Sequence, residues 1–173
     1  MYRYILAFGS NMGDKHLNFD KALQHLLSLE KKVFLLLNCG KRNLIKPFLS
    51  DKYDTSKHED YLNFVCEISS SLDPYTFYLK IIVPIEDELG HSRQKKWEPR
   101  CLDIDILFAA YEENSVKIKS FESCQLLYVE ENDFIVPHKD FFNRPEIMAL
   151  VVNDLGINLE KLKQRTFEKE THV

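Results

Sequence analysis

The sequence has 173 residues, of which 45% are hydrophobic and 29% charged, and its formal net charge is −4 at pH 7. This composition is typical of a soluble globular protein, and the length predicts one domain, residues 1–173, that buries a real core. The net negative charge excludes a general attraction to nucleic acid or to an acidic membrane surface, so an anionic ligand needs a local group of basic residues.

The cysteine pattern and the N-terminal segment indicate the cellular setting. No two of the four cysteines form a CxxC pair, which predicts reduced thiols rather than a disulfide or a zinc site. The apolar run at residues 4–8 is too short for a signal peptide, and no stretch approaches the roughly 20 apolar residues that span a bilayer. We therefore expect a cytoplasmic protein with no membrane partner.

The first half of the chain predicts two strands around a helix, then a loop and a third strand. Residues 2–8 form an aromatic and aliphatic run that ends at Gly9, and residues 16–29 repeat apolar side chains at helical spacing, with Asp14 or Asn11 as the cap. Residues 33–37 predict a buried strand, and residues 38–60 a long loop of the kind that is commonly functional. Residues 61–68 alternate like a strand, with Tyr61 and Asn63 on one face.

The second half predicts a broken helix, a further strand and a final helix. Residues 73–90 have helical spacing with Asp73 as the cap, but Pro84 lies inside the helix, where proline costs about 3 kcal/mol, so we expect a kink or break. Residues 94–100 are polar, 101–109 predict a strand, 111–120 a hairpin arm, 121–133 a loop and 134–138 an extended piece. Residues 143–156 predict a helix, and the charged tail from about 158 has no predicted structure. This order favours an α+β sandwich.

Two aspartates stand inside the strand predicted at residues 101–109. Side chains alternate along a strand, so Asp103 and Asp105 lie on one face with Cα atoms about 6.5–7 Å apart, while Leu102, Ile104 and Ile106 face the core. That spacing lets two carboxylates share one or two Mg²⁺ ions and leaves positions for water and phosphate. The alternative is a half-exposed strand with two solvated acids.

A basic segment comes directly before this strand. It contains His91, Arg93, Lys95, Lys96, Trp97 and Arg100. Arginine suits phosphate oxygens, and tryptophan stacks on a flat heterocycle, although a charge run taken alone is more often a solvated loop. Next to two acids, the segment predicts a polyphosphate site. The chain lacks GxxxxGK[ST] and GxGxxG loops, so side chains must hold any nucleotide.

Two further groups of polar residues are candidates for ligand contact. Tyr61 and Asn63 present a ring and an amide that suit a flat, polar bicycle, although both are ordinary strand residues in most proteins. His138 follows a proline and has Lys139 and Arg144 near it, which favours a phosphate contact over a purely structural histidine.

The segments LAFGSNMGD, DYLNFV, WEPRCLDIDILF and VPHKDFFNR together resemble the 6-hydroxymethyl-7,8-dihydropterin pyrophosphokinase family of folate biosynthesis, in the same order over residues 5 to about 150. The resemblance implies an αβα sandwich on a ferredoxin-like core with a mainly antiparallel sheet, working as a monomer. It also implies ATP and hydroxymethyldihydropterin as substrates, with the pyrophosphoryl group of MgATP passing to the pterin's hydroxymethyl oxygen and AMP released. No nucleic-acid partner is expected.

The resemblance implies a role for each matching position. Asp103 and Asp105 match the ligands of two Mg²⁺ ions, Arg100 matches an arginine on the triphosphate, and His91 stands where a catalytic-loop arginine is usual. The ATP-side positions are Glu86, Arg93, Lys96, Trp97, Ile106, His138, Lys139 and Arg144. The pterin-side positions are Tyr61, Asn63 and Trp97.

Several positions depart from the family pattern. His91 replaces an arginine, Glu98 replaces a glycine, and Val83 replaces a glutamine. Residues 40–49 lack the usual Tyr-x-Thr-x-Pro signature. Glu146 falls near the aromatic residue that normally stacks on the pterin, with Phe141 and Phe142 as alternatives. The departures leave a second hypothesis open, a non-catalytic relative that binds a nucleotide or a pterin. A nucleic-acid-binding sheet is a third, which the net charge and the strand aspartates weigh against.

Overall fold

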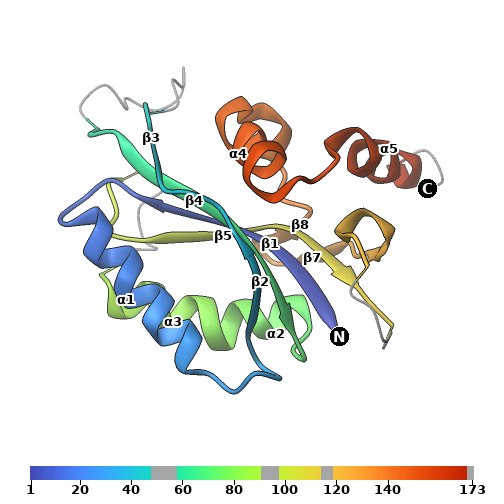
Figure 1. Cartoon of the computed structure of the whole chain (residues 1–173), viewed down its shortest axis with the longest axis horizontal. Helices are drawn as coiled ribbons and strands as arrows, with labels where there is room; N and C mark the ends of the chain where they lie inside the picture. Colours follow the sequence, from blue (N-terminus) through green and yellow to red (C-terminus); the bar gives the residue numbers. More distant parts are fainter. Residues whose placement is uncertain (48–57, 91–97, 114–118, 171–173) are drawn as a thin grey trace.

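The computed structural model describes residues 1–47, 58–90, 98–113 and 119–170. A six-stranded antiparallel sheet has the order β2-β4-β1-β5-β6, with β3 also paired to β4. Figure 1 shows α1, α2 and α3 on one face of this sheet, and α4 and α5 on the other. The predicted α+β class, a ferredoxin-like αβα sandwich with a mainly antiparallel sheet, is confirmed.

The predicted strands at the centre of the sheet form as expected. β1 (Tyr2–Ser10) lies between β4 (Tyr61–Ser70) and β5 (Asp103–Tyr111). In the register, Gly9 stands opposite Asn63 on one side and Asp103 on the other. All three strands are largely buried because helices cover both faces of the sheet, so their burial does not alternate as it would in a half-exposed sheet.

The first helix is also confirmed. α1 (Lys15–Ser28) begins after Asp14, whose carboxylate accepts a hydrogen bond from the Leu17 amide at 3.0 Å. Of the two predicted caps, Asp14 is therefore the one used. Phe19 and Leu26 bury the apolar face of this helix against the sheet.

The segment after α1 differs from its prediction. β2 (Leu35–Cys39) is a strand, but it lies at the sheet edge rather than in the core, and Leu35 is 42% exposed. A continuous apolar run does not distinguish an edge strand from a central one. The predicted loop contains β3 (Asn43–Ile45), which pairs with β4. Residues 48–57 of that loop lie outside the described residues.

A π-helical turn interrupts the next helix just before Pro84, where a kink or break was predicted. α2 (Pro74–Phe77) begins at the Asp73 cap, a π-helical turn follows at Tyr78–Ile82, and α3 (Val83–Glu88) continues the path. The Val83 amide donates to the Tyr78 carbonyl, five residues back. The wider turn places Pro84 in the first turn of a new helix, where its missing N–H costs little.

The connection from β5 to the C-terminal helices is more structured than expected. Tyr111, expected to open a hairpin arm, ends β5, and residues 114–118 lie outside the described part of the chain. The predicted loop at 121–133 contains a 3₁₀ turn (Phe121–Ser123), β6 (Gln125–Leu126) and β7 (Val129–Glu131). β7 pairs with β8 (Phe134–Val136), the predicted extended piece.

The chain ends in two helices. After a 3₁₀ turn (Phe141–Asn143), α4 (Pro145–Leu155) ends at Gly156, whose φ of 71° suits glycine. α5 (Leu159–Glu170) forms in the tail for which no structure was predicted, and Leu162 buries fully against the rest of the chain.

Each face of the sheet has its own core. Tyr4, Leu6 and Phe8 pack under α1 to α3, and Ile5 and Val151 belong to the core under α4 and α5. Among the residues described, no helix combines the length and hydropathy needed to cross a membrane.

Candidate functional site

The aspartate pair lies on the face of β5 that the sequence predicts. The side chains of Asp103 and Asp105 are 29% and 24% exposed, whereas Ile104 and Ile106 are only 4% exposed and belong to the core under α1 to α3. The alternation predicted for this strand is therefore confirmed, and both carboxylates stand on the sheet face that carries α4.

Each aspartate has a cationic partner. Arg100 Nη1 lies 2.7 Å from Asp103 Oδ1, and Arg144 Nη1 lies 3.0 Å from Asp105 Oδ2. His138 Nε2 lies 3.6 Å from Asp105 Oδ1. The structure thus brings together two aspartates, two arginines and a histidine, which lie up to 44 positions apart in the sequence.

Charge at the site is fixed by these contacts. Burial acts to raise the pKa of Asp105, but His138 and Arg144 together outweigh it and hold that pKa below its ordinary range. Burial acts to lower the pKa of Arg100, and Asp103 outweighs it so that the pKa is raised. At neutral pH Asp105 is therefore ionised next to permanent cations.

The donor set suits Mg²⁺. Within the described residues, no group of three or more His, Cys, Asp and Glu side chains gathers to hold a metal ion. Two partly exposed carboxylates on one strand are what Mg²⁺ uses when phosphate oxygens and water complete its shell, whereas a zinc or structural calcium site needs more protein ligands. Asp103 and Asp105 fit an ion that arrives with a phosphate ligand.

A pocket of about 140 Å³ opens beside β5. It is lined by Tyr78, Ile104, Asp105, Ile106, Asp133, Phe134, Ile135, His138 and Lys139. The His138 amide donates to the Leu107 carbonyl at 2.9 Å, which holds the segment after β8 against β5. Four residues predicted to contact ATP or metal, Asp105, Ile106, His138 and Lys139, therefore share one pocket.

Tyr61 and Asn63 lie across β1 from the aspartates. Because Gly9 pairs with both Asn63 and Asp103, these two side chains project from the same face on either side of a residue without a side chain. A Cβ on Gly9 would lie 3.3 Å from Asn63 Oδ1. Burial raises the pKa of Tyr61, so its hydroxyl keeps its proton, and it lies 3.1 Å from His58 Nδ1.

Glu86 is a structural contact as well as a predicted ATP-side residue. It is 3% exposed, and its carboxylate accepts a hydrogen bond from the Ile104 amide at 2.7 Å. This bond fixes the end of α3 to the start of β5, between the two aspartates.

Asn11 is a residue of the site whose role the sequence analysis missed. Its side-chain Oδ1 accepts a hydrogen bond from the main-chain N–H of Arg100 at 2.8 Å, and its main-chain N–H donates to the Arg100 carbonyl at 3.1 Å. It is 2% exposed, and its Nδ2 has no partner among the described residues. Only its place in the GSN segment signals it, and there it was considered a helix cap.

The sequence left Phe141, Phe142 and Glu146 as candidates for the position that stacks on the pterin, and the structure excludes one of them. Phe141 is fully buried, with its ring 5.0 Å from that of Phe108, so it is not available to a ligand. Phe142 is partly buried and packs against the same two rings, and Glu146 is exposed. Four predicted site residues, His91, Arg93, Lys96 and Trp97, lie outside the described residues.

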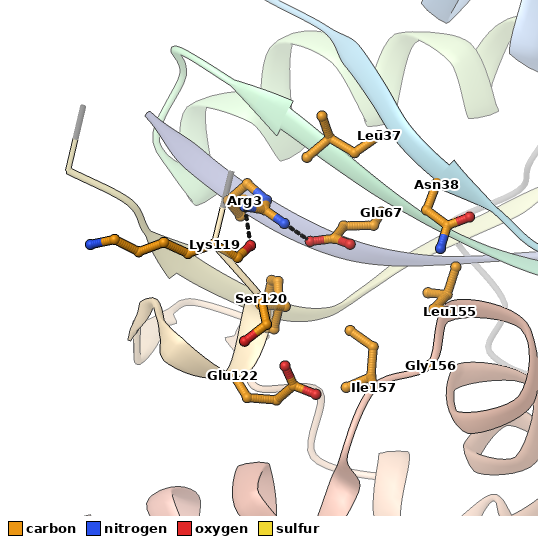
Figure 2. Close-up of a pocket in the computed structure, with 11 residues that line it drawn as sticks. Arg3, Leu37, Asn38, Glu67, Lys119, Ser120, Glu122, Leu155, Gly156 and Ile157 are labelled. Atoms are coloured by element: carbon orange, nitrogen blue, oxygen red, sulfur yellow. Dashed lines mark hydrogen bonds and ion pairs between the residues drawn. The ribbon is translucent and has the colours of Figure 1, made fainter. Parts of the chain in front are cut away.

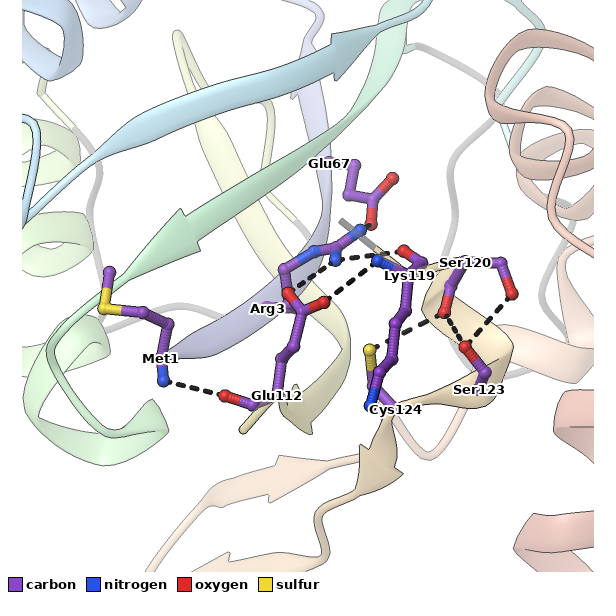
Figure 3. Close-up of polar contacts among 8 residues, drawn as sticks. All are labelled: Met1, Arg3, Glu67, Glu112, Lys119, Ser120, Ser123 and Cys124. Carbon is purple, nitrogen blue, oxygen red and sulfur yellow. Dashed lines mark hydrogen bonds and ion pairs between the residues drawn. The ribbon is translucent and has the colours of Figure 1, made fainter. Parts of the chain in front are cut away.

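A second charged cluster lies at the other end of the same sheet face. Arg3, 2% exposed, donates to Glu67, to Glu112 Oε2 at 2.9 Å and to the Lys119 carbonyl at 3.2 Å (Figure 3). Burial raises the pKa of Glu67. A cavity of about 300 Å³ adjoins the cluster, with Arg3 and Glu67 on its sheet side and Glu122 opposite (Figure 2).

Comparisons with known proteins point to one enzyme family. The family model described as 7,8-dihydro-6-hydroxymethylpterin-pyrophosphokinase matches residues 5–153. The chain is 28% identical to the Bifunctional protein FolKE of Lactococcus lactis, over 97% of this chain but 44% of that protein. It is 28% and 30% identical to the 2-amino-4-hydroxy-6-hydroxymethyldihydropteridine pyrophosphokinases of Bacillus subtilis and Aquifex aeolicus, over 83% and 76% of this chain and 72% and 74% of theirs.

Proposed function

Because the chain belongs to the 7,8-dihydro-6-hydroxymethylpterin-pyrophosphokinase family, we propose that it transfers the pyrophosphoryl group of MgATP to the hydroxymethyl oxygen of 6-hydroxymethyl-7,8-dihydropterin, giving AMP and the pterin diphosphate. One observation carries the proposal: two carboxylates, each with a cationic partner, lie across Gly9 from Tyr61 and Asn63 on the same face of the sheet.

The phosphate side of the site is built on β5. Asp103 and Asp105 would hold two Mg²⁺ ions, which when bound neutralise the developing charge on the transferred phosphoryl oxygens. Arg100, Arg144 and His138 bind the remaining phosphate oxygens, since each already faces a carboxylate and exchanges it readily for another anion. A strand fixes the spacing of the two acids, as an in-line displacement requires.

Part of the nucleotide occupies the pocket beside β5. From the family resemblance we place Ile106, a pocket residue that is 4% exposed, beside the adenine, and His138 and Lys139 face the phosphates from the segment after β8. From the family resemblance we also place Glu86, Arg93, Lys96 and Trp97 on the ATP side and His91 among the catalytic residues.

The acceptor lies on the β4 side of Gly9. The Tyr61 ring stacks on the pterin, as does Trp97 by resemblance. The Asn63 side-chain amide forms hydrogen bonds with the polar edge of the pterin. The alcohol attacks directly, so no protein nucleophile is needed. We also propose one domain that works as a cytoplasmic monomer without nucleic acid.

The test is AMP formation by the purified protein. AMP should appear from ATP only when hydroxymethyldihydropterin is supplied, and removing Mg²⁺ with a chelator should stop it. Binding of ATP or of the pterin without AMP formation would contradict the proposal and support a non-catalytic binding module instead.

A further inference from the structure

We propose that Asp154, in the last turn of α4, is a positioning residue for the acceptor, because it fixes the segment between β2 and β3 next to Tyr61 and Asn63. This inference rests on the proposed function for what binds there, but its structural part does not. The argument starts from one close contact between α4 and the main chain at Gly40.

Asp154 and the main chain at residues 40 and 41 are in direct contact. The Lys41 amide donates to Asp154 Oδ2 at 3.1 Å, and the Gly40 amide donates to the Val65 carbonyl at 2.8 Å. A Cβ on Gly40 would lie 2.6 Å from Asp154 Oδ2 and 2.8 Å from its Cβ. Only glycine fits at this position, because any side chain would push the segment away from α4.

The held segment leads directly into β3. Asn43 pairs with Asn63 and Ile45 with Tyr61, so the three residues of β3 lie alongside the proposed acceptor residues. The Asn43 side chain donates to the Lys41 carbonyl at 2.9 Å. A strand this short has few ladder bonds of its own, so its position depends on what holds its ends.

The other helical layer also holds the segment. Arg42 Nη2 lies 2.5 Å from Asp20 Oδ1 of α1. Residues 40–42 are therefore attached to α4 through Asp154 and to α1 through Asp20, from opposite faces of the sheet.

Asp154 is unfavourable for its own helix. A negative charge near a helix C-terminus opposes the macrodipole, and α4 has no basic residue in its last turn to compensate. Replacing Asp154 therefore does not weaken α4 itself, so the role of this carboxylate lies in its contact with Lys41.

α4 thus touches both halves of the proposed site. Immediately before its first residue Arg144 pairs with Asp105, and in its last turn Asp154 accepts a hydrogen bond from the Lys41 amide. Because an 11-residue helix is a rigid rod of about 16 Å, it sets the acceptor-side strand relative to the carboxylate. Loss of the Asp154 contact should loosen β3 and leave the Arg144 contact in place.

The kinetic test compares Asp154→Ala with Asp154→Asn and with Asn153→Ala, an exposed neighbour on α4. Asp154→Ala should raise KM for the pterin about fivefold, the effect of one ordinary hydrogen bond, and leave kcat and KM for ATP within about twofold. Asp154→Asn keeps an acceptor oxygen and should restore most of the loss. Gly40→Ala should also raise KM for the pterin, since its Cβ displaces the segment.

A structural readout separates this inference from the proposed function. Amide hydrogen exchange of residues 38–45, measured without substrates, should quicken in Asp154→Ala and Gly40→Ala but not in Asn153→Ala. Unchanged exchange would overturn the inference, as would an unchanged KM for the pterin, an equal change in all kinetic constants, or no rescue by asparagine. If the wild-type protein makes no AMP, the proposed function fails, and the exchange result still decides whether Asp154 holds this segment.

Discussion

Two charged clusters occupy opposite ends of one sheet face, and they differ in how their charges are paired. At the Arg3 end, a single guanidinium uses both terminal nitrogens on Glu67 and Glu112, whose side chains are 11% and 12% exposed. At the Asp103 end, each aspartate has its own arginine, and the four side chains are 24% to 30% exposed.

The difference separates a structural cluster from a ligand site. Removing one partner from a closed, buried cluster leaves a charge without compensation, so such a cluster acts on folding. Partly exposed ion pairs contribute little to stability and exchange partners at low cost, which a site for MgATP requires. Similar residue types therefore perform different tasks according to burial and pairing.

The largest expected effect is on catalysis at the Asp103 end. Asp105→Asn should lower kcat by about 100- to 1000-fold, because the amide removes a metal-binding charge and leaves Arg144 and His138 without their anion. The measurement is AMP formation at saturating substrates. Thermal unfolding should change little, and activity within threefold of wild type would exclude Asp105 as a metal ligand.

The Arg3 end should show the reverse pattern. Arg3→Met should lower the free energy of unfolding by about 3 kcal/mol, because two nearly buried carboxylates lose their shared cation. Urea unfolding measures this effect, and kcat should stay near wild type where the variant is folded. A large loss of kcat with unchanged stability would mean that this cluster belongs to the active site.

A smaller effect should follow from loosening Arg100. Asn11→Ala removes the side-chain acceptor for the Arg100 amide and should lower kcat about tenfold, the upper range for a neutral hydrogen bond. Asn38→Ala, an exposed asparagine at the edge of the sheet, is the matched control. Equal kcat in the two variants would show that Asn11 does not position Arg100.

The smallest effects concern pH, and the two clusters should have opposite signs. The pKa of Asp105 is lowered in the folded protein, so its stabilisation is present above the pKa of the unfolded chain and is lost as pH falls through the folded value. The pKa of Glu67 is raised by burial, so its contribution is largest at acid pH and declines as pH rises through that raised value.

Urea unfolding across the carboxyl range, without Mg²⁺, measures both slopes. Asp105→Asn should reduce the fall in the free energy of unfolding as pH is lowered. Glu67→Gln should reduce the fall in that free energy as pH rises through the raised pKa of Glu67. The same slope in both variants would contradict the contrast between the clusters.

Local patterns in the sequence predicted the parts of the fold that depend on neighbours in the chain. Strand alternation placed Asp103 and Asp105 on one face, and Asp14, Asp73 and Gly156 mark helix ends where capping rules expect them. Pro84 predicted a kink or break in its helix, and the irregularity is a π-helical turn just before it.

Contacts between distant segments were not predictable in this way. The bond between Asn11 and Arg100 spans 89 positions, and nothing local distinguishes this asparagine from a helix cap. Leu35 was expected inside the sheet because an apolar run does not reveal that its strand lies at the edge. α5 was not predicted because charged residues dominate its sequence. Only a few apolar side chains, Leu162 among them, pack this helix against the rest of the protein.

The π-helical turn at Tyr78–Ile82 contains one residue more than a turn of α-helix. Deleting one residue there would let the chain wind as an uninterrupted α-helix, in which the later side chains keep nearly the same direction, because the five-residue turn and an α-helical turn close on the same carbonyl. Glu86 would still face the Ile104 amide, but Pro84 would meet the carbonyl of the preceding turn. The extra residue therefore makes room for the proline ring, while α3 keeps the direction in which Glu86 anchors the strand bearing both acids.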